Sequence, residues 1–145
     1  MKNPKIITEP EEIRETKTGG KHRLMLLAKD TDGDIYIEDV VGKPGGGVEL
    51  HMHSLEDELF FIHKGEIIFT IGTDTHVVSA GAIVYAPLGV PHGIKFTGTE
   101  DAHFTTFVIP GRNFEAFVDA TSKIDAHADP QLKKDIAIKH GITTY

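Results

Sequence analysis

The stretch ELHMHSLEDELFFIHKGE, residues 49–66, combines two histidines with an apolar run typical of a buried strand. In a strand His51 and His53 would project from the same face, because they are two positions apart. Glu58 follows the turn residues SLED, and a hairpin there would return its carboxylate toward the histidines. Such ligands suit several divalent transition metals. This spacing is a weak signal by itself, since two surface histidines would be equally natural in a chain that contains 9.

The composition is that of an ordinary folded protein. The chain has 145 residues, of which 39% are hydrophobic and 26% are charged, and this length suits one domain with its own core. The net charge is -7 and the basic residues are scattered, which argues against nucleic-acid binding. The absence of cysteine excludes disulfides and thiolate metal sites. No segment has the pattern of a signal peptide or a membrane span, so we expect a cytoplasmic protein that does not bind membranes.

Turn residues divide most of the chain into short runs rich in Val, Ile, Phe, Tyr and Thr. The pair Asp32-Gly33 between two such runs is typical of a hairpin. This spacing predicts an all-β barrel or sandwich of antiparallel strands over residues 23–110. We interpret residues 1–145 as one domain, in which a polar arm of residues 1–22 precedes the barrel and a helical extension of residues 111–145 follows it.

Two short helices are expected in the extension. In the second, Asp129 is a candidate N-cap, Pro130 suits the first helical position and Gly141 is a candidate C-terminal stop. In the first, four residues would share one face: Phe114, Phe117, Val118 and Thr121.

A second motif lies in GAIVYAPLGVPHGIKF, residues 81–96. Together the two motifs resemble the signature of the cupin superfamily, and the spacing is similar to that of single-domain cupins related to quercetin dioxygenases. The first half, GX5HXHX4EX6G, is matched by Gly45, His51, His53, Glu58 and Gly65, and Gly65 is expected where a strand turns with a positive φ. The second half, GX5PXGX2HX3N, is matched by Gly81, Pro87, Gly89 and His92.

This resemblance implies a jelly-roll β-barrel, the cupin double-stranded β-helix, with one divalent transition metal ion per chain. The ion would be Fe, Mn, Ni, Co, Cu or Zn, and residue types do not choose among them. Four protein ligands would leave positions free for a small-molecule substrate. The family tendency also implies a homodimer. The implied metal ligands are His51, His53, Glu58 and His92.

Phe96 stands where the family signature often has Asn, so a polar group is missing from the expected pocket. Strand alternation predicts a set of apolar residues facing the pocket: Phe60, Ile62, Ile94 and Phe96. Such a pocket would suit an aromatic or weakly polar substrate. The same four residues would equally serve as barrel core alone.

Three functions are open. In the first, a metal-dependent dioxygenase, Glu58 would act as the catalytic base and accept the hydroxyl proton of an enolic or aromatic substrate. In the second, an isomerase or decarboxylase, a cationic residue would bind an anionic group, and Arg23 and Lys95 are candidates, although alternation turns Lys95 away from the pocket. In the third, a barrel would bind ligands without catalysis.

The other histidines fall in turns, at edges or in the tail and are each expected to be surface or hydrogen-bonded residues, and His63 should face away from the metal. Glu56 and Asp57 are expected to be solvated carboxylates of the turn before Glu58, although Asp57 could also swing toward the ion. The remaining histidines of this group are His22, His76, His103, His127 and His140.

Overall fold

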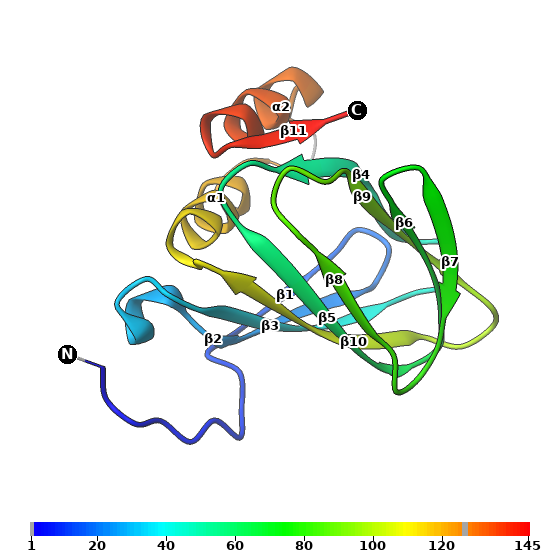
Figure 1. Cartoon of the computed structure of the whole chain (residues 1–145). Helices are drawn as coiled ribbons and strands as arrows, with labels where there is room; N and C mark the ends of the chain where they lie inside the picture. The colour runs from blue at the N-terminus through cyan, green and yellow to red at the C-terminus, as the bar shows by residue number, and fades with distance from the viewer. Residues whose placement is uncertain (1, 126–127) are drawn as a thin grey trace.

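In the computed structural model, which describes residues 2–125 and 128–145, two antiparallel sheets face each other and two helices lie beside one end (Figure 1). The strands alternate between inward hydrophobic and outward polar residues, as in β10, where every second side chain is buried. The predicted all-β jelly roll is therefore confirmed.

The larger sheet has the order β1-β2-β3-β10-β5-β8. Its strands are β1 (Glu12–Glu15), β2 (Lys21–Leu26), β3 (Tyr36–Gly42), β5 (Asp57–Lys64), β8 (Ile83–Ala86) and β10 (Ala102–Ile109). The smaller sheet has the order β11-β4-β9-β6-β7. Its strands are β4 (Gly47–His53), β6 (Glu66–Ile71), β7 (Asp74–Val78), β9 (His92–Thr97) and β11 (Ile142–Thr144).

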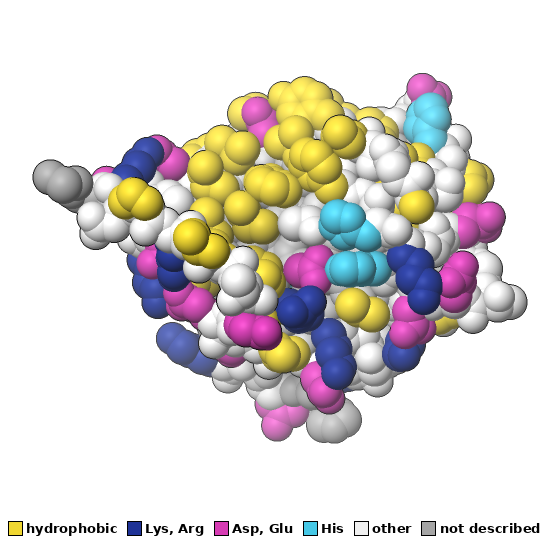
Figure 2. Space-filling view, turned by 90° about the horizontal axis from the view of Figure 1, so that it is seen from below, with side chains coloured by type: hydrophobic (Ala, Val, Ile, Leu, Met, Phe, Trp, Pro, Cys, Tyr) yellow, Lys and Arg dark blue, Asp and Glu magenta, His cyan; other side chains and the backbone are white. Residues whose placement is uncertain are grey.

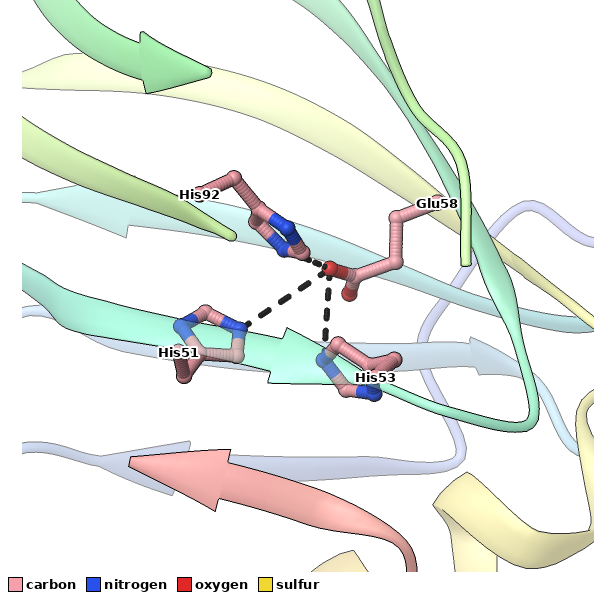
Figure 3. Close-up of side chains that lie close together, drawn as sticks. All are labelled: His51, His53, Glu58 and His92. Carbon is pink, nitrogen blue, oxygen red and sulfur yellow. Dashed lines mark hydrogen bonds and ion pairs between the residues drawn. The ribbon is translucent and has the colours of Figure 1, made fainter. Parts of the chain in front are cut away.

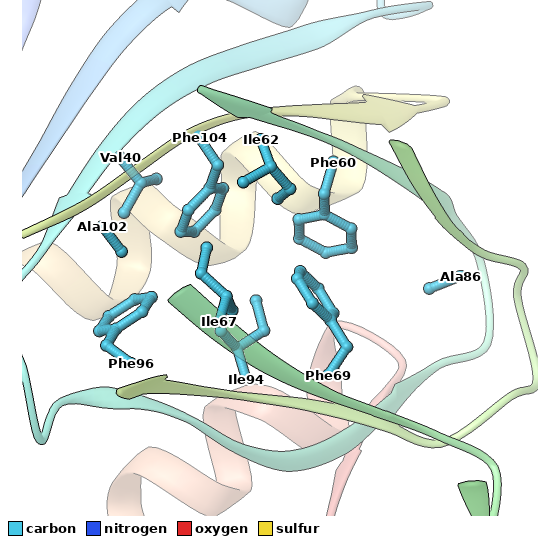
Figure 4. Close-up of a cluster of buried hydrophobic side chains, with 10 residues drawn as sticks. All are labelled: Val40, Phe60, Ile62, Ile67, Phe69, Ala86, Ile94, Phe96, Ala102 and Phe104. Atoms are coloured by element: carbon cyan, nitrogen blue, oxygen red, sulfur yellow. The ribbon is translucent and has the colours of Figure 1, made fainter. Parts of the chain in front are cut away.

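The hydrophobic core fills the space between the two sheets (Figure 4). Phe60 from the larger sheet and Phe69 from the smaller one meet with ring centroids 5.1 Å apart, which is a favourable distance for a tilted aromatic pair. The cluster comprises Val40, Phe60, Ile62, Ile67, Phe69, Ala86, Ile94, Phe96, Ala102 and Phe104. Its position leaves one end of the barrel free to form a site.

The N-terminal residues contain more regular structure than the sequence indicated. The predicted arm of residues 1–22 includes β1 and the first residues of β2, which pair antiparallel with Glu12 opposite Leu24. The Asp32-Gly33 turn lies where it was predicted, between two paired strands, but a 3-10 helix, Ala28–Thr31, lengthens the connection. The arm thus extends the larger sheet at its edge.

The C-terminal extension contains α1 (Arg112–Ser122) and α2 (Pro130–Lys139), as predicted. Asp129 caps α2 by accepting a hydrogen bond from the backbone N–H of Gln131 at 2.8 Å, and Gly141 ends it with a φ of 76°. The sequence did not predict β11, which pairs with β4 so that Ile142 lies opposite His53. No helix of the described residues is long and apolar enough to span a membrane.

Gly65 forms the tight turn between β5 and β6, as the sequence indicated. Its φ is 88°, and a Cβ atom there would lie 2.7 Å from the Cα of Ala102. Both the left-handed backbone and the close approach require glycine, so this turn sets the register in which β5 presents Glu58.

Candidate metal centre

Four side chains from three strands converge at one end of the barrel (Figure 3). His51 and His53 lie on β4, and His92 lies opposite His51 on the neighbouring strand β9. Glu58 comes from β5 in the facing sheet. One potential ligand atom from each of the four lies within 4.8 Å of the others. The structure therefore brings together all four residues of the predicted ligand set.

The carboxylate of Glu58 is at the middle of this group. Its Oε2 atom lies 2.6 Å from Nε2 of His92, 3.4 Å from Nε2 of His53 and 4.0 Å from Nε2 of His51. The His53 and His92 side chains are only 2% and 1% exposed, whereas that of His51 is 14% exposed. The group is therefore shielded from water on most sides and is most accessible beside His51.

The backbone selects the tautomer of two of these histidines. Nδ1 of His51 lies 2.7 Å from the carbonyl oxygen of Glu49, and Nδ1 of His92 lies 3.0 Å from that of Val90. Because a carbonyl oxygen only accepts hydrogen bonds, each Nδ1 must carry the proton. In the neutral imidazole, Nε2 then has a free lone pair, and in both residues it points toward Glu58.

His53 is oriented by a carboxylate. Its Nδ1 lies 3.1 Å from Oε2 of Glu56, so Nδ1 donates and Nε2 is again the free acceptor. This Nε2 is buried and has no hydrogen-bond partner among the described residues. A buried polar atom without a partner is costly, and here it faces two other imidazole nitrogens and a carboxylate. A divalent cation would satisfy all four groups, so the donor set fits a metal ion.

When no ion is bound, burial and the neighbouring groups shift the pKa values of His51, Glu58 and His92. Burial, followed by the charge of His92, lowers the pKa of His51 to about 4. Burial opposes the charged form of His92, but its hydrogen bond to Glu58 outweighs this effect and raises its pKa. Burial likewise opposes ionisation of Glu58, and the hydrogen bond from His92 nevertheless lowers its pKa. The metal-free centre therefore keeps a proton between His92 and Glu58.

Glu56 contradicts the expectation of a solvated turn carboxylate. It is 0% exposed and lies between two donors, Nδ1 of His53 and the side-chain amide of Asn113. That amide also donates to the carbonyl oxygen of His140 at 2.6 Å, so both C-terminal helices are tied to the centre. Its neighbour Asp57 is half-buried and accepts a hydrogen bond from the backbone N–H of Leu88 at 2.8 Å. Neither is a free surface group.

The loop before His92 is hydrogen-bonded to the end of β4, the strand that carries His51 and His53. The backbone N–H of Gly89 donates to the carbonyl oxygen of His53 at 2.7 Å, and Gly89 has a φ of 79°. Together with the bond from Leu88 to Asp57, this contact holds the loop against the ends of both β4 and β5. The loop therefore delivers His92 from a restrained position.

A cavity of about 780 Å³ extends from the centre between the sheets, and His51, His53 and Glu58 form part of its wall. Of the predicted pocket residues, Phe60, Ile94 and Phe96 line the cavity. Ile62 does not line it and belongs to the core alone. Apolar atoms make up most of the exposed surface of the wall, and the predicted face of α1 also lines it: Phe114, Phe117, Val118 and Thr121. This volume is typical of sites for drug-sized ligands.

Comparison with known proteins agrees with this geometry. Residues 39–109 match the family model described as a cupin domain. The chain belongs to the cupin superfamily. The solved structure of a predicted oxalate decarboxylase from Thermotoga maritima superposes on this cupin with a TM-score of 0.62 and 24% identity. The superposition covers 93% of that protein and 70% of this cupin. That likeness concerns the fold alone.

Three relatives share parts of the sequence with this cupin, and one of them is uncharacterized. An uncharacterized protein of Streptomyces coelicolor is 40% identical over 56% of this cupin and 72% of its own length. The oxalate-binding protein of Thermotoga maritima is 33% identical over 46% of this cupin and 54% of its own length. Quercetin 2,3-dioxygenase of Bacillus subtilis is 28% identical over 66% of this cupin and 28% of its own length. The cupin thus spans about half or less of the two relatives with a named activity.

The family's usual Asn is replaced in this cupin by Phe96, whose ring packs on a glycine. A Cβ atom added to Gly42 would lie 2.1 Å from the Phe96 ring, so the ring covers the bare backbone of β3. Phe96 is 6% exposed and also contacts Phe104 at a centroid distance of 6.0 Å. The substitution therefore makes this part of the cavity wall apolar.

A second cluster of possible ligands lies on the outer face of the larger sheet. It joins Asp39, His63 and His103. His103 donates to Asp39 at 2.7 Å, and Thr105, which is 2.7 Å from His63, donates to Asp39 at 3.1 Å. The three side chains are linked through Thr105, and none of them has a buried nitrogen without a partner, in contrast to His53. His63 faces away from the centre, as predicted, but His103 lies within β10 and not in a turn.

The two cations considered for an anionic substrate do not reach the cavity. Arg23 pairs with Asp39 at 2.9 Å on the outer face, and Lys95 is exposed. Instead, the cavity is lined by Arg14 and His22, which sequence reasoning placed in the arm or at the surface. Pairing of β1 with β2 brings them there, and no local pattern indicated it. The prediction for His127 falls outside the described residues.

Proposed function

We propose that this cupin is a metal-dependent dioxygenase whose substrate is an enolic or aromatic molecule chelated to an ion held by His51, His53, Glu58 and His92. The observation that carries the proposal is that three imidazole Nε2 atoms and one carboxylate converge at the wall of a largely apolar cavity. The ion, when bound, would supply Lewis acidity to two substrate oxygens.

The protein would contribute a base in a dry environment. Glu58 is 5% exposed, and its lowered pKa keeps it ionised at neutral pH. It would accept the proton of the substrate hydroxyl at Oε2, leaving an electron-rich enolate whose carbon reacts with dioxygen. The apolar wall would exclude water from this enolate. Phe60 and Phe96 would pack on the substrate rings.

The size of the cavity supports this class of substrate over oxalate, which the name of one relative suggests. A volume of about 780 Å³ greatly exceeds the need of a molecule with six heavy atoms. Among the described residues, Arg14 is the only Lys or Arg in the lining, and its guanidinium already binds Glu12 at 2.8 Å and the carbonyl oxygen of Val118 at 3.1 Å. An oxalate-type activity would thus lack a free cationic partner other than the metal.

We also propose that the cupin forms a homodimer through the outer face of the larger sheet. Figure 2, which views the molecule from below, shows hydrophobic side chains gathered over a broad area beside two histidines. Ile83 and Tyr85 are 62% and 53% exposed, and Phe61 and Phe107 contact each other at 5.1 Å on the same sheet. A second copy would bury these residues. A Tyr85→Asp variant should sediment as a monomer if this face is the interface.

The experiment that tests the enzymatic proposal is oxygen uptake. The purified chain would be loaded separately with Fe, Mn, Co, Ni, Cu or Zn and mixed with flavonols and simpler enols. Uptake that depends on both metal and substrate would support a dioxygenase. Tight binding of an enol without uptake would indicate a sensor, and release of carbon dioxide from oxalate would indicate a decarboxylase. Either result would contradict the proposed reaction.

A further inference from the structure

A second polar group lines the same cavity, away from the metal centre. Glu38 lies on the inner face of β3, is 7% exposed and carries no partner among the Lys and Arg side chains of the described residues. Its oxygens instead meet Nδ1 of His22 and the hydroxyl of Tyr36, each at 3.2 Å. Burying a carboxylate costs free energy unless it is hydrogen-bonded, and these two donors offset that cost for Glu38.

The contacts hold the ring of His22 in one orientation. Because the carboxylate accepts, Nδ1 of His22 carries the proton and donates to Glu38. The opposite ring nitrogen, Nε2, has no hydrogen bond to any residue in the described part of the chain, and His22 lines the cavity. Burial raises the pKa of Tyr36, so its hydroxyl stays protonated and keeps donating to Glu38. Nε2 is therefore an oriented and unused hydrogen-bonding group.

The polar group and the metal centre are separated by apolar wall. Tyr36 lies opposite Val108 and Val108 opposite Glu58, so Tyr36 is two strands from the metal ligand. His22 is one strand farther and lies opposite Val40, four residues along the strands from the row of Tyr36 and Glu58, so the backbones of His22 and Glu58 are separated by about 14 Å across the strands and about 13 Å along them. Phe104 on β10, between the two ends, and Phe60 on β5, two residues from Glu58, line the cavity. A bound molecule with about three rings could span this separation, because the side chains at both ends reach inward from the sheet.

We propose that His22, positioned by Glu38 and Tyr36, binds a hydroxyl group at the end of the substrate remote from the metal centre. This inference rests on the proposed function and deepens it, because it makes the substrate two-ended, with chelating oxygens, an apolar middle and a remote hydroxyl. His22 is then a specificity-determining residue, and Glu38 is a positioning residue.

The charge of the wall favours a hydroxyl over a carboxylate at this end. Five carboxylates line the cavity: Glu12, Glu15, Glu38, Glu49 and Glu58. In the part of the chain that the structure describes, Arg14 is the only Lys or Arg in the lining, and it binds Glu12, Val118 and Asp119. A second anion beside Glu38 would be repelled, whereas a neutral hydroxyl can bond to Nε2 in either protonation state of His22. Burial opposes the charged form of His22, but the hydrogen bond to Glu38 outweighs it and raises the pKa, so the hydroxyl accepts from Nε2–H when the ring is charged and donates to Nε2 when it is neutral.

The test compares three probes on the metal-loaded full chain. The first is 3-hydroxyflavone, which has the chelating oxygens and no remote hydroxyl, and the others are 3,4′-dihydroxyflavone and 3,7-dihydroxyflavone. Dissociation constants would be measured by fluorescence titration under anaerobic conditions. We expect one dihydroxy probe to bind about five- to tenfold tighter than 3-hydroxyflavone, as for one added hydrogen bond.

Variants then ask whether His22 causes the preference. His22→Phe should abolish it while leaving metal content and the affinity for 3-hydroxyflavone unchanged, and Glu38→Gln should reduce it. His76→Phe, at an exposed position of β7 outside the cavity, is the matched control. If His22→Phe does not fold, His22→Gln is used in its place. The Gln variant should show less than the full preference for the dihydroxy probe.

The outcomes separate this inference from the proposed function. If 3-hydroxyflavone binds but neither dihydroxy probe binds more tightly, or if the preference survives in both His22 variants, the role of His22 is wrong and the proposed function stands. If no probe binds the metal-loaded chain, the proposed function is wrong and the role of His22 falls with it.

Discussion

Nδ1 of His53 donates to a carboxylate, that of Glu56, which is itself fully buried and lies 3.1 Å away. The pair extends the candidate metal centre beyond its four converging side chains, because Glu56 also accepts from Asn113 at the start of α1. The C-terminal helices therefore help to orient a histidine that the barrel strand alone would leave free to rotate.

The first prediction concerns this pair. Glu56→Gln should weaken metal binding by about tenfold, since the neutral amide supports the His53 tautomer less strongly. A competition titration with a chromophoric chelator would measure the change. Glu100→Gln is the control, because that side chain is 63% exposed and lies in a surface ion pair. Equal affinities of the two variants would contradict a positioning role for Glu56.

The second prediction separates catalysis from metal retention. Glu58→Gln should lower turnover of the proposed reaction by about a hundredfold or more, because the amide cannot accept the substrate proton. His51, His53 and His92 remain, so elemental analysis should still find metal in the variant. A variant that loses its metal but keeps its rate when resupplied would show that Glu58 is a ligand and not the base.

The third prediction is the pH dependence of metal affinity. The raised pKa of His92 in the metal-free centre means that its proton must leave before an ion binds. Affinity should therefore be highest above that pKa and fall by about tenfold per unit as the pH drops below it. His51, with a pKa of about 4, should add a second proton only in stronger acid.

Calorimetric titrations in buffers of different ionisation enthalpy would measure this proton release. We expect up to one proton per ion between pH 5 and 7, from the centre formed by His92 and Glu58. Affinity that stays constant from pH 7 to pH 5 would be incompatible with a site of three histidines.

The fourth prediction concerns stability. Phe96→Asn, which restores the residue common in the family signature, should lower the free energy of unfolding by about 3 kcal/mol, because it removes a ring packed on Gly42 and buries an amide. Phe96→Leu should lower the free energy of unfolding by about half that amount. Urea denaturation of the metal-free chain would measure both, and a loss below about 1 kcal/mol for Phe96→Asn would mean that the wall repacks freely.

Local patterns were sufficient for the parts of the site that lie on single strands and turns. Alternation placed His51 and His53 on one face, and the turn residues placed Glu58 at the start of the next strand. Gly65 and the capping residues of α2 were also predicted correctly, since a positive φ and a helix cap depend on neighbours in sequence.

The prediction was wrong where a residue's environment comes from distant parts of the chain. Glu56 is a charged residue in a turn, which is typical of a solvated side chain. It is covered by α1, which lies more than fifty residues later in the chain. The strand β11 is three residues long and exists because β4 offers it an edge. His22 faces the cavity because β2 pairs with β3, and no residue near it indicates this.

The amino-acid sequence by itself determined the all-β class, the spacing of four convergent metal-ligand candidates and the ends of α2, because strand alternation, turn chemistry and helix capping act over a few residues. Only the tertiary structure decided that Glu56 is buried against His53 and that Glu38 and His22 share a cavity with the metal centre. These relationships depend on pairing and packing between strands and helices distant in sequence, where burial is a property of the assembled fold.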